Sequence, residues 1–236
     1  MQIDLLDHVP GAVAARGIAV VIDVFRAFSV APHAFDCGAA RVLPAGEVEE
    51  ALELGRRFPG AVLIGERHAR KLPGFDAGNS PTEIRSLDLS GKVVVHTTHA
   101  GTQGLVNAAG ADEVLTGSFV NITAIRDYLL RRAPSRVSLV RMGHEASERC
   151  AEDDLCAECL AMMLRGEHAP LAEVRERLRS APAAQKFFDA AADYAPATDF
   201  DYCTEVDRFD FVLRLRRSRG EPLELERVPN TGLAAG

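Results

Sequence analysis

A continuous apolar run near the N-terminus, Ile18-Ala19-Val20-Val21-Ile22, constrains the fold more than any other stretch. Its residues are mostly β-branched and leave no polar side chain to face water, which is typical of a strand buried on both faces of a sheet. The run ends in charge, because Asp23 follows at once and Arg26 comes three residues later. Open α/β sheets bind ligands at the carboxyl ends of their strands, so this pair marks a candidate site. The alternative is that Asp23 caps the next segment and Arg26 is a surface charge.

Strand-like and helix-like segments alternate about six times along the chain. This alternation predicts an α/β fold with a mostly parallel sheet, covered by helices on both faces in three layers. The expected strands cover residues 2–6, 18–22, 41–44, 61–64, 92–95, 113–115 and 136–140. The expected helices cover residues 28–40, 47–58, 103–109, 121–132 and 151–164, and one more begins at Pro81.

Prolines set the expected breaks in this pattern. Pro10 with Gly11 predicts a loop after the first strand, and Pro44 is expected to end the third. The helix after Arg26 requires Pro32 to lie in its first turn, because an interior proline removes a hydrogen bond and clashes with the preceding turn.

The composition and the periodicity of the sequence change in the last third of the chain. Residues 170–198 are alanine-rich and helical in pattern, whereas residues 209–215 alternate as a strand and residues 223–225 form a second, shorter one. We therefore expect an α/β core over residues 1–165 and a smaller α+β part over residues 166–236, packed on that core.

Composition and charge exclude several classes of protein. The 236 residues are 47% hydrophobic and 26% charged, which suits a sizeable core, and the formal charge is −7. Such a chain lacks the basic balance of a nucleic-acid binder, but an acidic protein can still hold a locally positive site. We expect no signal peptide and no membrane contact, because the start is not basic and no run of about 18 apolar residues occurs. The five cysteines are expected to be reduced thiols in a cytoplasmic protein.

Polar clusters recur where the expected strands end. Each alone is weak evidence, because an acid beside an arginine can be a surface pair and a serine or threonine can simply cap a helix. Neighbouring parallel strands bring such clusters to one edge of the sheet, where together they would line one crevice. Besides Asp23 and Arg26, the clusters are Glu66 with Arg67, Thr97 and Thr98 with Gly101 and Thr102, and Glu152 with Asp153.

The residue types in these clusters suit magnesium and phosphate. Mg²⁺ prefers one or two carboxylates together with water and phosphate oxygens, and arginine matches phosphate through a bidentate fork. Ser80, Pro81 and Glu83 fit the N-cap, N1 and N3 positions of a capping box, so a helix N-terminus adds neutral donors. Phosphoryl transfer depends on charge neutralisation and positioning more than on acid–base chemistry.

Five segments of the chain resemble the 2-phosphosulfolactate phosphatase family in order and rough spacing. The resemblance covers residues 1–165 well and the remainder loosely. It implies a Mg²⁺-dependent phosphatase linked to coenzyme M biosynthesis, acting on a phosphate ester of a small acid that also carries a sulfonate and a carboxylate. The segments are VIDVFRAFSV at 21–30, GER at 65–67, GFDAGNSP at 74–81, TTHAGT at 97–102 and EDDLCA at 152–157.

The resemblance and the chemistry together suggest roles for the acids. Asp23 is expected to be a metal ligand, with Glu152 or Asp153 as a second carboxylate, while Glu66 is either a ligand or a base for water. A covalent aspartyl route is disfavoured, because haloacid-dehalogenase-like enzymes need an aspartate where this chain has Phe25. A metal-activated water is therefore the expected nucleophile.

The remaining site residues are expected to bind the substrate. Arg26 and Arg67 would hold the phosphate and stabilise charge as the ester bond breaks. The other expected contacts are Asn79, Ser80, Thr97, Thr98, His99, Gly101 and Thr102.

Several positions depart from the family pattern and predict an altered pocket. Phe28 and Val30 stand where threonines are usual, and His99 and Ala100 replace a threonine and an asparagine. A related phosphate ester is therefore open as the substrate. Further departures are Met142, which follows the expected strand at residues 136–140, and Glu158, which follows the EDDLCA segment.

Two other functions stay open. A non-catalytic or weakly active relative would bind an anionic metabolite without turnover. A zinc-thiolate protein would use Cys150, Cys156, Cys159 and His144, although Cys156 and Cys159 fall on an apolar helix where small buried cysteines are common. The expected partner is a small anionic phosphorylated substrate, with neither nucleic acid nor membrane, and a homodimer is left open.

Overall fold

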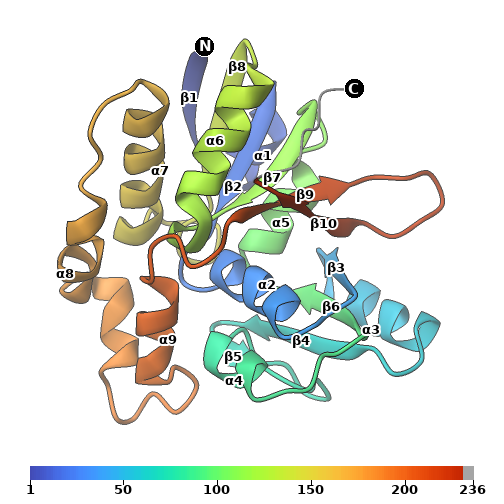
Figure 1. Ribbon diagram of the computed structural model, residues 1–236. Coiled ribbons are helices and arrows are strands. Elements are labelled where there is room, and N and C mark those ends of the chain that lie inside the picture. Colours follow the sequence, from blue (N-terminus) through green and yellow to red (C-terminus); the bar gives the residue numbers. More distant parts are fainter. Residues whose placement is uncertain (231–236) are drawn as a thin grey trace.

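The computed structural model describes residues 1–230 and shows an α/β fold built on a ten-stranded sheet (Figure 1). The predicted fold class is confirmed. The strands are β1 (Gln2–Asp7), β2 (Ile18–Ile22), β3 (Arg41–Ala45), β4 (Val62–Arg67), β5 (Arg70–Lys71), β6 (Val93–Thr97), β7 (Glu113–Gly117), β8 (Arg136–Arg141), β9 (Phe211–Arg216) and β10 (Glu224–Pro229). The α-helices are α1 (His8–Ala14), α2 (Ala27–Asp36), α3 (Val48–Arg57), α4 (Pro81–Arg85), α5 (Gly101–Asn107), α6 (Ile122–Arg132), α7 (Ala151–Leu164), α8 (Val174–Arg179) and α9 (Ala197–Cys203).

The sheet consists of two parallel blocks joined by an antiparallel hairpin. Its strand order is β1-β8-β2-β7-β9-β10-β3-β6-β4-β5. The first four strands run parallel to one another, and β3, β6 and β4 form the second parallel block. The β9–β10 hairpin lies between the blocks and is drawn in red in Figure 1. Its outer pairing is short, because Leu115 pairs with Arg214 on one side and Val42 with Leu225 on the other.

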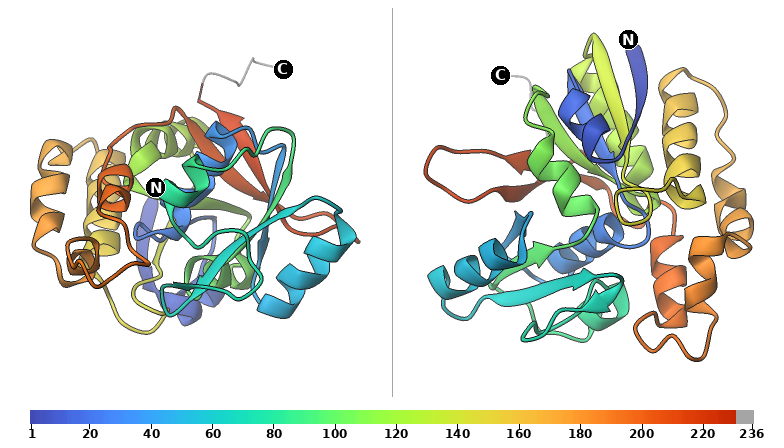
Figure 2. Two further views of the ribbon diagram at one scale, coloured as in Figure 1. Left: turned by 90° about the horizontal axis from the view of Figure 1, so that it is seen from below. Right: turned by 180° about the vertical axis from the view of Figure 1, so that it is seen from behind.

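Helices cover both faces of the sheet, as the apolar sequence of β2 predicts (Figure 2). Val20 and Ile22 pack into a core with α6 and α7, whereas Ala19 and Val21 pack on the opposite face with α1, α2 and α5. Strands β3 and β6 are covered on both faces in the same way. Leu43, Ala45 and Val95 pack against α3, whereas Val42 and Val94 pack on the other face with α2 and α4. Burying one valine or isoleucine side chain stabilises the fold by roughly 1.5–3 kcal/mol. Burial on both faces therefore holds β2 in one position in the sheet, and the residue that follows its end is placed with it.

The C-terminal strands belong to the sheet and occupy its middle. The two strands expected at residues 209–215 and 223–225 are present as β9 and β10. Residues 170–198 contain only short helical pieces, which are α8, the first residues of α9 and two 3₁₀ helices, η2 (Leu171–Glu173) and η3 (Pro182–Phe187). A division of the chain into domains 1–165 and 166–236 stays a prediction.

Three expectations based on proline are wrong. The segment after β1 is helix α1, because Pro10 lies in its first turn, where no N–H is needed. Pro32 is an interior residue of α2, since that helix already begins at Ala27, whose N–H donates to Asp23 Oδ1 at 3.2 Å. Strand β3 continues through Pro44 to Ala45, because β10 pairs with β3 only at Val42 and so leaves Pro44 without a neighbour on that side.

None of the helices in residues 1–230 combines the length and the apolar character that crossing a membrane requires.

Candidate active site

A pocket of about 220 Å³ lies at the carboxyl ends of strands from both parallel blocks. Its wall includes three buried carboxylates, two cationic side chains and two further polar groups, besides His144 and Glu145 of the β8–α7 loop. The carboxylates come from the ends of β2 and β4 and from the start of α7, and the cations from the start of α2 and from η3. These side chains are Asp23, Glu66, Glu152, Arg26, Lys186, Asn79 and His99.

Asp23 and Glu152 are acids held in a poorly solvated place. They are only 7% and 3% exposed. Burial raises the pKa of Asp23 to about 7, and the charges of Glu66 and Glu152 add to this rise. Burial also raises the pKa of Glu152, whose Oε2 has no hydrogen-bond partner among the described residues. Three buried carboxylates around one pocket, one of them with an unsatisfied buried oxygen, suit a hard divalent cation such as Mg²⁺, which also keeps water ligands.

Glu66 is held in place by two loops of the second block. Strand β4 ends at Arg67, three residues later than predicted, so Glu66 is part of the strand and not of the loop after it. Its Oε1 accepts the N–H of His99 and its Oε2 the N–H of Ala69, each at 2.8 Å. The carboxylate therefore fixes the loops after β4 and β6 while it faces the pocket.

Asp153 accepts hydrogen bonds from two backbone N–H groups. Its Oδ1 accepts the N–H of Val24 at 2.9 Å, and its Oδ2 accepts the N–H of Gly143 at 2.8 Å. These bonds join the loops after β2 and β8, and both oxygens are already engaged. Within residues 1–230 the pocket wall includes Glu152 and not Asp153, so Glu152 is the better second ligand of the two.

Arg26 is oriented by a buried ion pair that the sequence did not reveal. Its Nη1 donates to Asp199 Oδ2 at 2.6 Å, and both side chains are at most 2% exposed. The other oxygen of Asp199 accepts from the Ser80 hydroxyl and the Thr82 N–H. Ser80 caps α4 as predicted, but the structure places its hydroxyl against Asp199. No motif surrounds Asp199 that would have marked it.

Arg67 is not brought to the pocket. Its Nη1 donates to the Glu66 carbonyl at 2.8 Å, and its Nη2 donates to the Gly46 carbonyl at 3.1 Å and to Thr97 Oγ1 at 3.2 Å. These bonds fasten the end of β4 to its neighbours and use the guanidinium edges that phosphate would need. Lys186, which the sequence analysis missed, supplies the second pocket cation, and burial lowers its pKa.

The threonine-rich segment mainly builds the start of α5. Thr98 Oγ1 accepts the N–H of Thr102 at 3.1 Å, and Thr102 Oγ1 accepts the N–H of Thr98 at 2.9 Å. Both side chains are buried and absent from the described pocket wall, as is Thr97. Asn79 does line the pocket and contacts His96 Nε2 through Oδ1 at 3.2 Å. Of the predicted substrate contacts, Arg26, Asn79 and His99 thus line the pocket.

Gly101 is required by the close approach of α5 to Asp23. A Cβ at residue 101 would lie 2.7 Å from Asp23 Oδ2 and 2.7 Å from Ala27 Cβ. We expect Gly101→Ala to lower the free energy of unfolding by about 1–3 kcal/mol, the usual cost of overpacking, measured by urea denaturation. The control is Gly110→Ala, where a Cβ first meets the flexible end of Arg16. Equal losses in the two variants would contradict this explanation.

Comparison with known proteins places the chain in a family. A profile described as 2-phosphosulpholactate phosphatase matches residues 4–218. The chain belongs to this family. It is 30% identical over 221 residues to a probable 2-phosphosulfolactate phosphatase of Bacillus subtilis strain 168, covering 92% of this chain and 94% of that one. Proteins with the same name are 32% identical in Caldanaerobacter subterraneus (84% and 87% covered) and 34% identical in Thermotoga maritima (82% and 87% covered).

Most departures from the 2-phosphosulfolactate phosphatase pattern lie away from the pocket. Phe28 and Val30 are fully buried residues of α2 itself, and Met142 is buried as well. Glu158 lies exposed on α7. Phe28 and Val30 are therefore not part of the described pocket wall, although Phe28 packs beside Gly101 and Asp23. His99 and Ala100 do line the pocket, so the change in this member of the family is concentrated there.

Proposed function

We propose that the chain is a Mg²⁺-dependent phosphatase that hydrolyses a small anionic phosphate ester, 2-phospho-3-sulfolactate or a related phosphorylated hydroxy acid. The observation that carries this proposal is the meeting of three buried carboxylates and two cations in one pocket of a chain from this family. The names of the relatives support the substrate class. A cytoplasmic role in coenzyme M biosynthesis follows from that substrate, and the homodimer stays a prediction.

The pocket offers separate places for a metal ion and for phosphate. Asp23 and Glu152 would hold Mg²⁺, with Glu66 either as a third ligand or as a base that takes a proton from water. When bound, the ion supplies charge neutralisation and makes water more acidic. Arg26 and Lys186 would bind the phosphoryl oxygens and stabilise the charge that grows as the bond to the ester oxygen breaks. The oxygen of water would bond to phosphorus as the bond to the ester oxygen breaks, and a proton from that water would reach the leaving oxygen, so that the hydroxy acid departs as the alcohol.

Asp199 and Glu66 prepare this arrangement before substrate binds. Nη1 of Arg26 donates to Asp199 and to the Tyr194 carbonyl, and Nη2 donates to the Ala69 carbonyl. The guanidinium is therefore already oriented, so little side-chain entropy remains to be lost on phosphate binding. Glu66 holds the loop carrying His99 against the pocket. His99 stands where the family has a threonine, and its larger side chain on the pocket wall would narrow the range of substrates that fit.

The proposal is tested by phosphate release from 2-phospho-3-sulfolactate and a panel of phosphorylated hydroxy acids. We expect release that EDTA abolishes and added Mg²⁺ restores, because the acids otherwise repel the anionic ester. Thermal stabilisation by one of these esters without phosphate release would instead identify a non-catalytic binding protein. Release that persists in EDTA would contradict the metal-dependent mechanism.

A further inference from the structure

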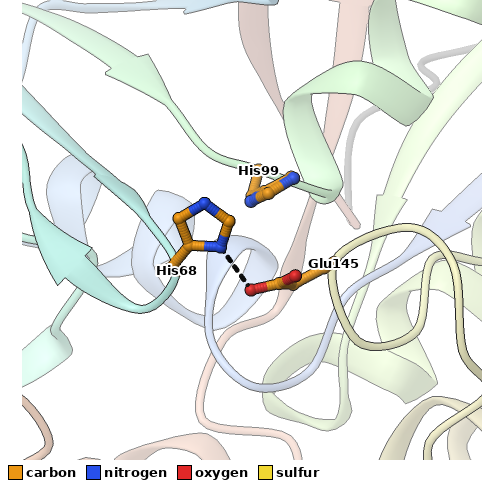
Figure 3. Close-up of side chains that lie close together, drawn as sticks. All are labelled: His68, His99 and Glu145. Atoms are coloured by element: carbon orange, nitrogen blue, oxygen red, sulfur yellow. Dashed lines mark hydrogen bonds and ion pairs between the residues drawn. The ribbon is translucent and has the colours of Figure 1, made fainter.

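Three side chains at the pocket meet in a way that the phosphatase chemistry does not use. His68, His99 and Glu145 come from the β4–β5 turn, the β6–α5 loop and the β8–α7 loop (Figure 3). One ligand atom from each lies within 4.8 Å of the other two. His68 Nδ1 is 2.6 Å from Glu145 Oε1, and the two imidazole centroids are 4.8 Å apart. Within residues 1–230 no other three histidine, cysteine or acidic residues bring their ligand atoms this close together, and those of Asp23, Glu66 and Glu152 lie further apart.

The backbone around this group is held in place, although the side chains keep some freedom. Glu66 accepts the N–H groups of Ala69 and His99, and it thereby fixes the loops that carry both histidines. His68 and Glu145 have φ values of +52° and +49°, in the left-handed region that costs energy for residues other than glycine. The His68 side chain is 71% exposed, so it can rotate to shorten the ligand–ligand distances.

One nitrogen of the group lacks a partner. His99 Nδ1 is buried from solvent and has no hydrogen bond within the described residues. A buried polar atom without a partner costs free energy, and an imidazole nitrogen can satisfy it with a metal ion. The Glu145 carboxylate faces both imidazoles, because its Oε1 lies 2.6 Å from His68 Nδ1 and its ligand atom lies within 4.8 Å of one from His99. The carboxylate can therefore supply an oxygen ligand to the same ion.

We propose that His68, His99 and Glu145 form a binding site for a borderline divalent transition-metal ion of the Zn²⁺ class. Two imidazoles and one carboxylate are a ligand set that zinc uses when a coordination position stays open. Imidazole nitrogen suits zinc, copper, iron and nickel, whereas Mg²⁺ prefers oxygen ligands, so this site and the carboxylate site select different ions. His99 and Glu145 also line the pocket, so a bound ion adds positive charge to its wall.

This site differs from the thiolate site considered from the sequence. Cys150, Cys156 and Cys159 do not come together with His144 among the described residues, and burial raises the pKa of Cys156 and Cys159. Metal binding at His68, His99 and Glu145 does not depend on phosphate hydrolysis, so each of the two proposals can fail without the other.

The test uses the full chain, stripped of metal and then held in excess Mg²⁺ so that the carboxylate site is occupied. Co²⁺ is added as a spectroscopic probe, and its visible absorption and binding isotherm are measured. We expect one equivalent of Co²⁺ to bind and to be displaced by Zn²⁺ but not by more Mg²⁺. His68→Gln and His99→Gln should each weaken Co²⁺ binding by at least the roughly 10–100-fold that loss of an outer-shell partner costs.

Two variants serve as controls. His168→Gln removes an exposed histidine outside the group and should bind Co²⁺ like the unaltered chain. Asp23→Asn should retain Co²⁺ binding even where Mg²⁺-dependent phosphate release is lost, which separates this proposal from the proposed function. Thermal unfolding of each variant checks that it is folded. The proposal is overturned if His68→Gln and His99→Gln bind Co²⁺ normally, if His168→Gln weakens binding equally, or if only Asp23→Asn abolishes it.

Discussion

Asp23→Asn is expected to lower kcat for phosphate release by about 10³-fold, a loss of about 4 kcal/mol in transition-state stabilisation. The amide keeps the size of the carboxylate and its acceptor for the Ala27 N–H, but it cannot balance the charge of a metal ion. Phosphate release at saturating Mg²⁺ measures the loss, and Mg²⁺ titration measures the accompanying rise in Kd.

The same substitution should not weaken the metal-free fold. Asp23 is a buried acid beside Glu66 and Glu152, and its raised pKa shows that its ionised form is disfavoured there. Removing that charge is therefore expected to leave the thermal stability of the metal-free protein at pH 8 unchanged or higher. The control is Asp36→Asn at the exposed end of α2, which should change kcat by no more than about twofold. Full activity of Asp23→Asn would refute the assigned role.

Asp199→Ala is expected to lower the free energy of unfolding by about 3–5 kcal/mol. The substitution leaves the Arg26 guanidinium buried without its charge partner and also removes the acceptor for Ser80 and Thr82. Chemical denaturation measures the loss. Phosphate release should fall as well, because Arg26 loses the contact that orients it.

An exposed ion pair provides the matched control for Asp199→Ala. Arg57 and Glu221 lie 3.3 Å apart with side chains 49% and 55% exposed, so Glu221→Ala should change stability by no more than about 0.5 kcal/mol. Adding Arg26→Met to Asp199→Ala should restore part of the lost stability, because the unpaired charge is removed. If Asp199→Ala costs no more than Glu221→Ala, the buried pair does not have the proposed role.

The fold was largely predictable because its signals are local. The apolar run of β2 and the capping box at Ser80 each report a conformation that a few neighbouring residues decide. The expectations based on Pro10, Pro32 and Pro44 failed because proline forbids one hydrogen bond, and whether that bond is needed depends on neighbours elsewhere in the chain. The central position of the β9–β10 hairpin is also set by distant pairing.

The sequence predicted which strand ends form the site, but the contacts of individual side chains depend on residues far away in the chain. Asp23, Glu66 and Glu152 could be expected together, because strand ends in a parallel sheet share one edge. Arg67 likewise stands at the end of a strand, yet hydrogen bonds to the carbonyls of Glu66 and Gly46 hold its side chain away from the pocket. Asp199 and Lys186 come from the last quarter of the chain, and no spacing pattern connects them to β2. Only the tertiary contacts reveal these partners.

The hairpin between the two parallel blocks has a consequence for synthesis of the protein. Asp23 and Glu152 stand on the first block and Glu66 and His99 on the second, whereas the strands that join the blocks are translated after all four. A nascent chain on the ribosome therefore carries every metal-binding carboxylate before it can bring them together. Until β9 and β10 emerge, β7 and β3 present open edges that other chains can pair with. Completion of the site and protection from aggregation thus come with the same late strands.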